Sequence, residues 1–163
     1  MTEVIGALTP LASCACSERE QAFADFYHRW QDDRQVVDKW FSLQAASNLH
    51  GTLDEVRALL DHPAFELSNP NRFRSLVGAF SRNNQVRFHD PGGAGYRFVV
   101  DQLLRLIPVN PQVAAQLLTP LTNWRRFEEG KRSHMRRELM RIQGISDLPP
   151  DVYDIVTKSL GEI

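Results

Sequence analysis

Apolar residues recur at helical spacing between Asn69 and Asn84, in the middle of the chain. Four of them occupy positions i, i+3, i+4 and i+7 and therefore share one helix face: Phe73, Leu76, Val77 and Phe80. Ser68 or Asn69 can cap the start of this helix, and Pro70 falls in the first turn, where proline is tolerated. The pattern predicts a buried central helix with three arginines outside its apolar stripe: Arg72, Arg74 and Arg82.

The same periodicity predicts helices along the rest of the chain. Before the central helix we expect one over 3–11 and one after Asp32-Asp33, with two more opened by capping boxes at Ser17 and Thr52. After it, a glycine-rich loop over 88–95 precedes helices over 96–107 and from Asn110-Pro111 to Trp124. A charged turn over 128–132, a basic helix and a last helix from Pro149 complete the chain. No segment shows the period of two that a strand requires, so the predicted class is all-α.

The helix starts at Asn69, Asn110 and Pro149 lie about 40 residues apart, which is the period of HEAT and armadillo repeats. This spacing predicts stacked antiparallel helix pairs in a HEAT/armadillo-like α-solenoid, with one concave and one convex surface. We expect residues 1–163 to form a single helical-repeat domain, because this length is sufficient for one hydrophobic core.

Composition indicates an ordinary globular protein, with 42% hydrophobic and 24% charged residues. A net charge of −1 argues against a dedicated nucleic-acid binder. The basic stretch from Arg125 to Arg141 is interleaved with glutamates and is expected to be a solvated helix face rather than an RNA site. Cys14 and Cys16 are too close for a good disulfide, which favours a reducing, cytoplasmic compartment. We expect no membrane span, because no apolar run approaches ~20 residues.

The chain offers little catalytic chemistry of its own. No two histidines lie four residues apart, so there is no His-Glu-x-x-His zinc helix, and no nucleophile elbow or phosphate loop occurs. His89-Asp90 could form a catalytic pair, but a solvated or turn-capping histidine is the simpler interpretation. Gln112 and Gln116 share one helix face, which is either plain surface or the lining of a polar groove. We therefore expect no catalytic residue and no metal site.

A series of motifs resembles the C-terminal helical domain of bacterial aminopeptidase N, in order and over almost the whole chain. Before the central helix these motifs are Val37-Asp-Lys-Trp-Phe41, Thr52-Leu-Asp-Glu-Val-Arg57 and Leu60-Asp-His-Pro-Ala-Phe65. The resemblance continues through the central helix from Asn69 to Phe80. It then includes Gly93-Ala-Gly-Tyr96, Asn110-Pro-Gln-Val-Ala114, Trp124-Arg-Arg-Phe127 and Asp151-Val-Tyr153.

That family consists of zinc metallopeptidases that remove N-terminal residues from peptides. The resemblance implies a non-catalytic domain that caps the catalytic domain, restricts access and lines the substrate cavity. The zinc helix, the amide-anchoring loop and the catalytic tyrosine belong to domains that this sequence lacks. Arg74 and Gln112 match family residues that face the cavity. Related enzymes can carry an arginine where this chain has Gln116, which puts an ionic contact from that position in doubt.

The resemblance implies particular binding partners for the chain, and the sequence leaves other functions as alternatives. The implied partners are the catalytic domain of a parent aminopeptidase and its peptide substrate, with zinc bound by the intact enzyme. In isolation the chain is expected to expose an apolar docking surface and to self-associate. The main alternative is a free-standing helical-repeat adaptor that binds a protein segment in its concave groove. An independent enzyme is disfavoured because metal ligands and a placed nucleophile are absent.

Overall fold

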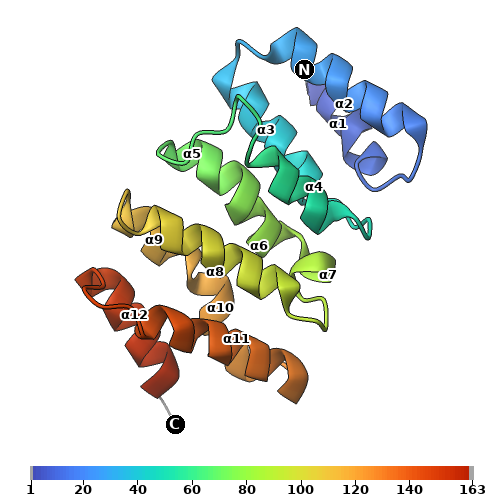
Figure 1. Ribbon diagram of the computed structural model, residues 1–163. Coiled ribbons are helices and arrows are strands. Elements are labelled where there is room, and N and C mark those ends of the chain that lie inside the picture. The colour runs from blue at the N-terminus through green and yellow to red at the C-terminus, as the bar shows by residue number, and fades with distance from the viewer. Residues whose placement is uncertain (1, 162–163) are drawn as a thin grey trace. The chain divides into compact units, whose positions relative to one another are not determined.

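The computed structural model describes residues 2–161, and throughout this range the only regular elements are helices (Figure 1). The predicted all-α class is confirmed. The chain divides into two compact units, the first ending at Arg87 and the second beginning at Phe88. Each unit is described by itself below.

The first unit begins with α1 (Thr2–Leu11), α2 (Ser17–Trp30), α3 (Arg34–Ala45) and α4 (Thr52–Leu59). The central helix follows in three consecutive parts, α5 (Pro70–Phe73), the π-helical η1 (Arg74–Gly78) and α6 (Ala79–Asn83), and precedes the short α7 (Gln85–Phe88). Helix α3 lies at the centre of this unit, where it packs against α2, α4 and the central helix.

The predicted stripe of the central helix is confirmed. Its four side chains are at most 1% exposed, and burying each contributes about 1.5–3 kcal/mol: Phe73, Leu76, Val77 and Phe80. On α3, Phe41 is also fully buried. Asn84, just after the central helix, donates from Nδ2 to the carbonyl oxygens of Ala45 and Ser47. Side-chain packing and this polar contact together fix α3 against the central helix.

Amide and carboxylate caps start three helices at positions where the sequence predicts helix starts. Asp33 accepts from the backbone N–H groups of Gln35 and Val36 at the start of α3. Asn69, rather than Ser68, caps α5 by accepting from Asn71 and Arg72. Asn110 accepts from the N–H of Val113 in the second unit. Each such cap contributes about 1 kcal/mol, because it satisfies helix N–H groups that have no partner within the helix.

The two predicted hydroxyl caps are wrong. Ser17 and Thr52 are the first residues inside α2 and α4, and neither helix has a side-chain cap. Glu55, the expected second half of the Thr52 box, instead binds Arg19 from α2. Thr52 Oγ1 is left buried without a hydrogen-bond partner among the described residues. A tertiary ion pair therefore displaces the local capping pattern.

The second unit contains α8 (Ala94–Leu106), α9 (Pro111–Leu117), α10 (Thr119–Thr122), the 3₁₀ turn η2 (Trp124–Arg126), α11 (Glu129–Gln143) and α12 (Pro150–Gly161). Helix α11 packs against α8 and α12, and α9 packs against α8 and α12. Side chains from these helices form its core, and the following are at most 1% exposed: Tyr96, Val99, Leu103, Leu121, Met135, Leu139 and Val152.

Two predicted boundaries in this unit are wrong. The single helix expected from Pro111 to Trp124 breaks after Leu117. Pro120 explains the break, since its ring cannot donate a hydrogen bond and would clash with the preceding helical turn. The expected charged turn over 128–132 is instead the first turn of α11, which begins at Glu129.

The glycine-rich loop before α8 contains one position that requires glycine. Gly93 has φ +69°, in the left-handed region that side chains other than glycine rarely adopt. A Cβ atom there would lie 2.7 Å from Cγ of His134 on α11. The loop can therefore approach α11 closely only because residue 93 has no side chain.

Candidate functional site

The central helix changes its hydrogen-bond pattern in the middle, at η1. The N–H of Ala79 donates to the carbonyl oxygen of Arg74, five residues back, as in a π-helix. Such turns are rare and occur frequently at functional sites, because the extra residue changes the direction of nearby side chains. Arg74, the arginine for which we predict a site role, is the first residue of this π turn and is half-buried.

Helix α3 contacts the π turn through a hydroxyl group. Ser42 Oγ lies 3.0 Å from the carbonyl oxygen of Ser75 and 2.9 Å from that of Asp38, so its single hydrogen is shared between two acceptors. Ser75 Oγ lies 2.8 Å from the carbonyl oxygen of Arg72 and 3.4 Å from Oδ1 of Asp38. These contacts give the π turn partners outside its own helix.

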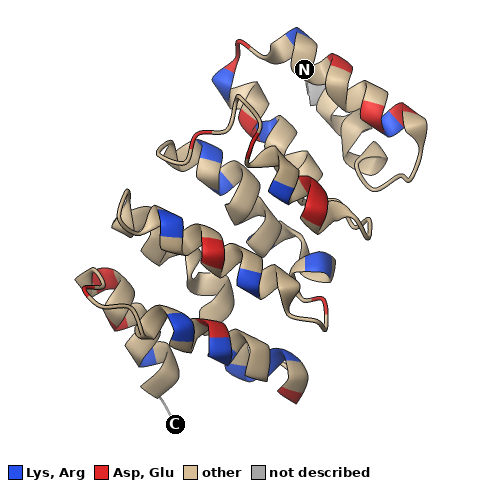
Figure 2. Cartoon of the chain, in the orientation of Figure 1, with Lys and Arg blue, Asp and Glu red and all other residues tan. Residues whose placement is uncertain are grey.

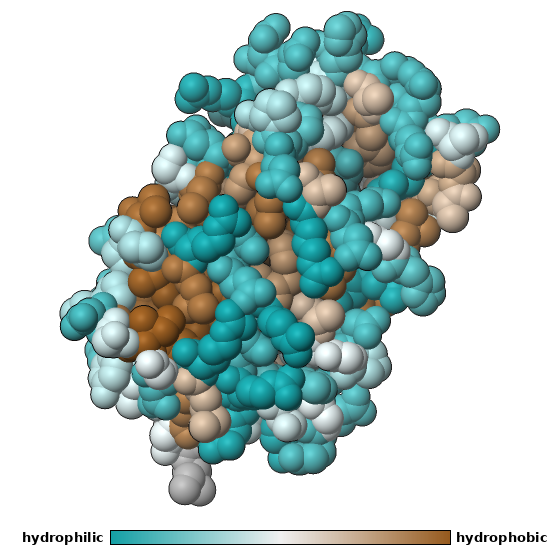
Figure 3. Space-filling model, in the orientation of Figure 1, coloured by the Kyte–Doolittle hydropathy of each residue, from teal (hydrophilic) through white to brown (hydrophobic). Residues whose placement is uncertain are grey.

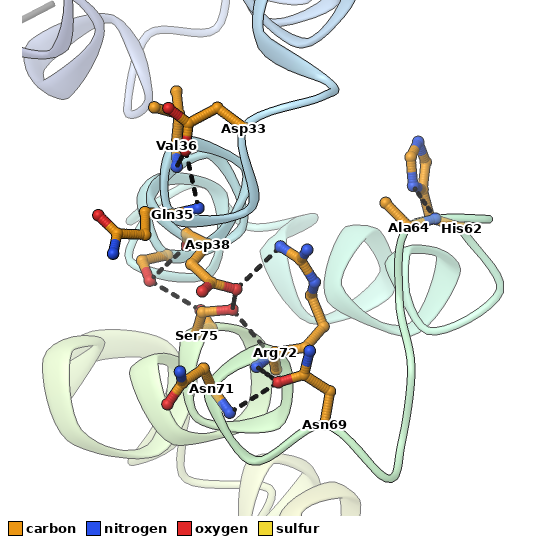
Figure 4. Close-up of polar contacts among 11 residues, drawn as sticks. Asp33, Gln35, Val36, Asp38, His62, Ala64, Asn69, Asn71, Arg72 and Ser75 are labelled. Carbon is orange, nitrogen blue, oxygen red and sulfur yellow. Dashed lines mark hydrogen bonds and ion pairs between the residues drawn. The ribbon is translucent and has the colours of Figure 1, made fainter.

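Arg72 is part of the scaffold beside this turn (Figure 4). Its Nη1 lies 2.8 Å from Oδ1 of Asp38, and its guanidinium carbon is 5.3 Å from the centre of the Phe41 ring. The residue is 6% exposed, and its Nε atom has no hydrogen-bond partner within the described chain. The ion pair and the aromatic ring hold Arg72 in the interior, so it is unsuited to contact a ligand.

Arg74 is placed differently from Arg72. Two residues apart, the two side chains leave the helix on different sides, and only Arg72 is fully buried. Glu55 of α4, in the same unit, accepts hydrogen bonds from Arg19 at 3.1 and 2.5 Å. Asp101 pairs with Arg141 in the second unit. Arg74 is half-buried, which agrees with its expected position outside the apolar stripe.

The other two predicted site residues lie on α9, in the second unit. Gln112 and Gln116 are one helical turn apart, and both are exposed. The cap by Asn110 and the first-turn Pro111 fix the start of the helix that carries them. They form a paired amide face on the surface of their unit. Arg74 belongs to the first unit, so a cavity shared by the three residues stays a prediction.

A hollow that the sequence did not reveal lies between α2, α3 and α4. It measures about 450 Å³ and is lined by apolar Phe23 and Trp40 together with polar Glu20, Gln44 and His62. The apolar wall and the few polar groups are typical of ligand pockets. Its lining residues come from three consecutive helices and from the turn after α4, spread over positions 19–62, so no single motif predicts this hollow.

His62, at the edge of this hollow, sits among aromatic rings. Its ring centre is 4.7 Å from that of Tyr27, 5.1 Å from that of Trp40 and 5.8 Å from that of Phe41. Burial, followed by the positive charge of Arg72, lowers the pKa of His62 below its usual value. Nδ1 accepts the N–H of Ala64, so the neutral ring carries its hydrogen on Nε2.

His89 packs against an aromatic ring. The sequence suggested either a catalytic pair with Asp90 or a solvated or turn-capping histidine. The residue is half-buried, its ring stacks on Phe127 with centres 4.4 Å apart, and its Nδ1 lies 2.8 Å from the hydroxyl of Tyr96. Burial lowers the pKa of His89, with a smaller contribution from Lys131, while burial raises the pKa of Tyr96 to about 12. It is Asp90 that supports the turn, by accepting the N–H of Gly92.

The described residues contain few other features that could bind a ligand or react. Within 2–161, no three His, Cys, Asp or Glu residues come together in a way that could hold a metal ion. Cys14 and Cys16 are free thiols, and the hydrogen bond between them raises the pKa of Cys14. None of the helices in this range is long and apolar enough to cross a membrane.

An apolar groove of about 300 Å³ lies between α1 and α2, lined by Val4, Leu8 and Phe26 among others.

Comparison with known proteins assigns the fold to a class. The family described as "Domain of unknown function (DUF3458_C) ARM repeats" matches residues 1–161. The chain therefore belongs to this family of armadillo-repeat domains, and the predicted helical-repeat architecture is confirmed.

The relatives show where such a domain occurs. The chain is 42% identical to aminopeptidase N of Haemophilus influenzae and of Caulobacter vibrioides, over 98% and 99% of its length. It is 39% identical to aminopeptidase N of Escherichia coli K12 over 98% of its length. The chain spans only 18–19% of these proteins, and it corresponds to their C-terminal domain. The suggested resemblance is confirmed.

A solved structure agrees with this assignment. The crystal structure of Legionella pneumophila aminopeptidase A in complex with aspartic acid matches the whole chain with a TM-score of 0.94 and 34% identity. The match covers 19% of that protein. The similarity of fold and sequence therefore extends over the same share of a larger peptidase.

Proposed function

We propose that this chain is the non-catalytic C-terminal domain of a zinc-dependent aminopeptidase N, cytoplasmic in location, and that residues 1–163 act as one functional domain. In this role it caps the catalytic domain, restricts access for peptides and lines the substrate cavity. The observation that carries the proposal is the similarity of nearly the whole chain to about a fifth of aminopeptidase N from three bacteria.

The chain's own contribution is to bind and position rather than to catalyse. Zinc belongs to the remainder of such an enzyme, where it would activate water for peptide-bond hydrolysis. The described residues here offer no comparable cluster of ligands. The chain's partners are accordingly the catalytic domain, by docking, and the peptide substrate, by polar contacts.

Arg74 is the residue best suited to contact a peptide. A guanidinium is always charged and offers five N–H donors in a rigid fork, which suits carbonyl oxygens and carboxylates. Its place at the start of the π turn, with α3 fixing the next residue through Ser42, gives the side chain a defined origin. Gln112 and Gln116 add amide groups that can donate to and accept from a peptide backbone.

A second candidate function is that of a free-standing adaptor that binds a protein segment. The observation that favours it is the hollow of about 450 Å³ in the first unit, which combines aromatic and polar walls without help from another domain. In this alternative the His62 ring and Trp40 would receive an apolar side chain of the partner.

A domain exchange separates the two functions. Aminopeptidase N of Escherichia coli is prepared without its C-terminal domain and with this chain fused in its place. We expect the fusion to recover hydrolysis of alanine p-nitroanilide relative to the truncated enzyme, and to cleave short peptides in preference to long ones. If the folded fusion and the truncated enzyme show the same rates and the same length preference, the capping role is wrong.

A further inference from the structure

A second hollow, on the surface of the second unit, has three arginines among its lining residues. It measures about 260 Å³ and lies between η2 and α11. Its walls include Trp124, Glu129, Arg132, Arg136, Arg137 and Met140. Glu129, Arg132, Arg136 and Met140 follow each other at intervals of three or four, so they form one continuous stripe on α11, and Arg137 lies beside it. We call this feature the α11 groove.

The α11 groove has an excess of positive charge. Residues 124–143 contain seven arginines and lysines but only three glutamates, and the blue segments of α11 are visible in Figure 2. Each glutamate already has a basic neighbour: Glu128 binds Lys131 at 3.1 Å, Glu129 binds Arg132 at 3.4 Å and Glu138 binds Arg141 at 3.0 Å. Arg136 has no ion-pair or hydrogen-bond partner among the described residues, so its donors remain available.

Apolar surface lies beside these cations. Met140, one turn after Arg136, is 47% exposed although it is a large hydrophobic residue. Trp124 forms part of the wall, is only 7% exposed and has its indole N–H within 3.2 Å of Ser159 Oγ. The flexible thioether of methionine adapts to varied apolar side chains. The groove thus offers guanidinium donors and an apolar contact within the same small space.

We propose that the α11 groove binds an acidic segment of a partner protein, with carboxylates at Arg136 and Arg137 and an apolar side chain against Met140. Arginine forks fit carboxylates well, and complementary charge accelerates and selects such encounters. This inference is independent of the proposed aminopeptidase role, since it uses no residue assigned to the substrate cavity.

A nucleic acid fits the groove less well. Binding to single strands relies on bases stacking on exposed aromatic rings, whereas Trp124 is buried and its ring is covered by the guanidinium of Arg125 at 4.5 Å. The whole chain has a net charge of −1, without the basic excess typical of nucleic-acid binders.

The test measures binding of a fluorescein-labelled, glutamate-rich peptide with one central leucine by fluorescence anisotropy at low salt. We expect Arg136→Ala to weaken binding about tenfold or more, because a charge-assisted contact is lost. Lys158→Ala removes an equal charge from an exposed position on α12 and should change the affinity less than about twofold. Met140→Ser, which leaves the charge unchanged, should weaken binding severalfold.

Three outcomes would overturn the proposal. The first is no detectable binding by the unmodified chain at low salt. The second is an equal loss in Arg136→Ala and Lys158→Ala, which would indicate non-specific attraction. The third is displacement of the peptide by a single-stranded RNA oligomer at lower concentration than by unlabelled peptide, which would indicate a nucleic-acid site. Circular dichroism of each variant confirms that the helices are retained.

Discussion

Ser42 on α3 lies 3.0 Å from the carbonyl oxygen of Ser75, within the π turn of the central helix. The turn begins at Arg74, so a contact from a neighbouring helix supports the backbone next to the predicted substrate-contacting arginine. This relationship links the packing of the first unit to the proposed site.

Ser42→Ala tests whether α3 stabilises the π turn. The substitution removes the hydroxyl and leaves the Ser75 carbonyl without this donor, which should lower the free energy of unfolding by about 0.5–1.5 kcal/mol. Urea unfolding followed by circular dichroism measures the change. Ser133→Ala, on the exposed side of α11, is the control and should unfold as the unmodified chain does. Identical midpoints for all three proteins would show that the helix holds the turn without α3.

Substitution of Arg72 should destabilise the first unit much more than substitution of Arg74. Arg72→Ala breaks a buried ion pair, for which losses of about 3–5 kcal/mol are typical; the partial exposure of Asp38 reduces the loss. Arg74→Ala removes a half-buried side chain and should cost less than about 1 kcal/mol. Thermal unfolding of the two variants compares them directly. A larger loss for Arg74→Ala would identify Arg74 as scaffold.

Gly93→Ala should destabilise the second unit. The residue has φ +69°, and a Cβ atom would approach His134 to 2.7 Å, so a loss of about 1–3 kcal/mol is expected. Gly92→Ala is the matched control, because its Cβ would meet only Asp90 Oδ1 at 3.8 Å. Urea unfolding should leave Gly92→Ala near the unmodified chain. Equal effects of the two substitutions would contradict the close approach of this loop to α11.

Acid should destabilise the first unit through His62. Its pKa is lowered in the folded chain from 6.5, mainly by burial, so the unfolded chain binds a proton more readily than the folded one. The contribution of the neutral His62 ring to the free energy of unfolding is therefore fully present above pH ~6.5. It declines as the pH falls below that value. His62→Asn, which can still accept the N–H of Ala64, should flatten this decline in melting temperature between about pH 7.5 and 5. An unchanged pH profile in the variant would exclude His62 as the cause.

The sequence is sufficient to predict features that depend on neighbouring residues. The stripe from Phe73 to Phe80, the cap at Asn69 and the helix starts at Asp33 and Asn110 are local, and the structure confirms them. The break before Pro120 was missed, because the apolar spacing on either side suggested one helix.

The missed features depend on residues far apart in the chain. The Thr52 cap is lost because Glu55 binds Arg19 on another helix. The π turn has its outside contact with α3, and the His62 environment combines Tyr27, Trp40 and Phe41 from two other helices. No periodicity within one segment contains this information.

The isolated chain is also expected to expose apolar surface. Hydrophobic areas reach the exterior on the face shown in Figure 3, and several large apolar side chains are at least 39% exposed: Val4, Val86, Val109, Met140, Ile145 and Tyr153. These observations support the expected docking surface, and self-association of the isolated chain stays a prediction.

The most direct measurement of the central claim is the kinetics of Arg74→Ala in the fusion with the catalytic part of Escherichia coli aminopeptidase N. If Arg74 contacts the peptide, losing one charged hydrogen bond should lower kcat/KM by about ten- to a hundredfold while the melting temperature stays nearly constant. Arg82→Ala, an exposed arginine on the same helix, is the control and should leave kcat/KM within about twofold. Normal kinetics in a folded Arg74→Ala fusion would contradict the assignment of this chain to the substrate cavity.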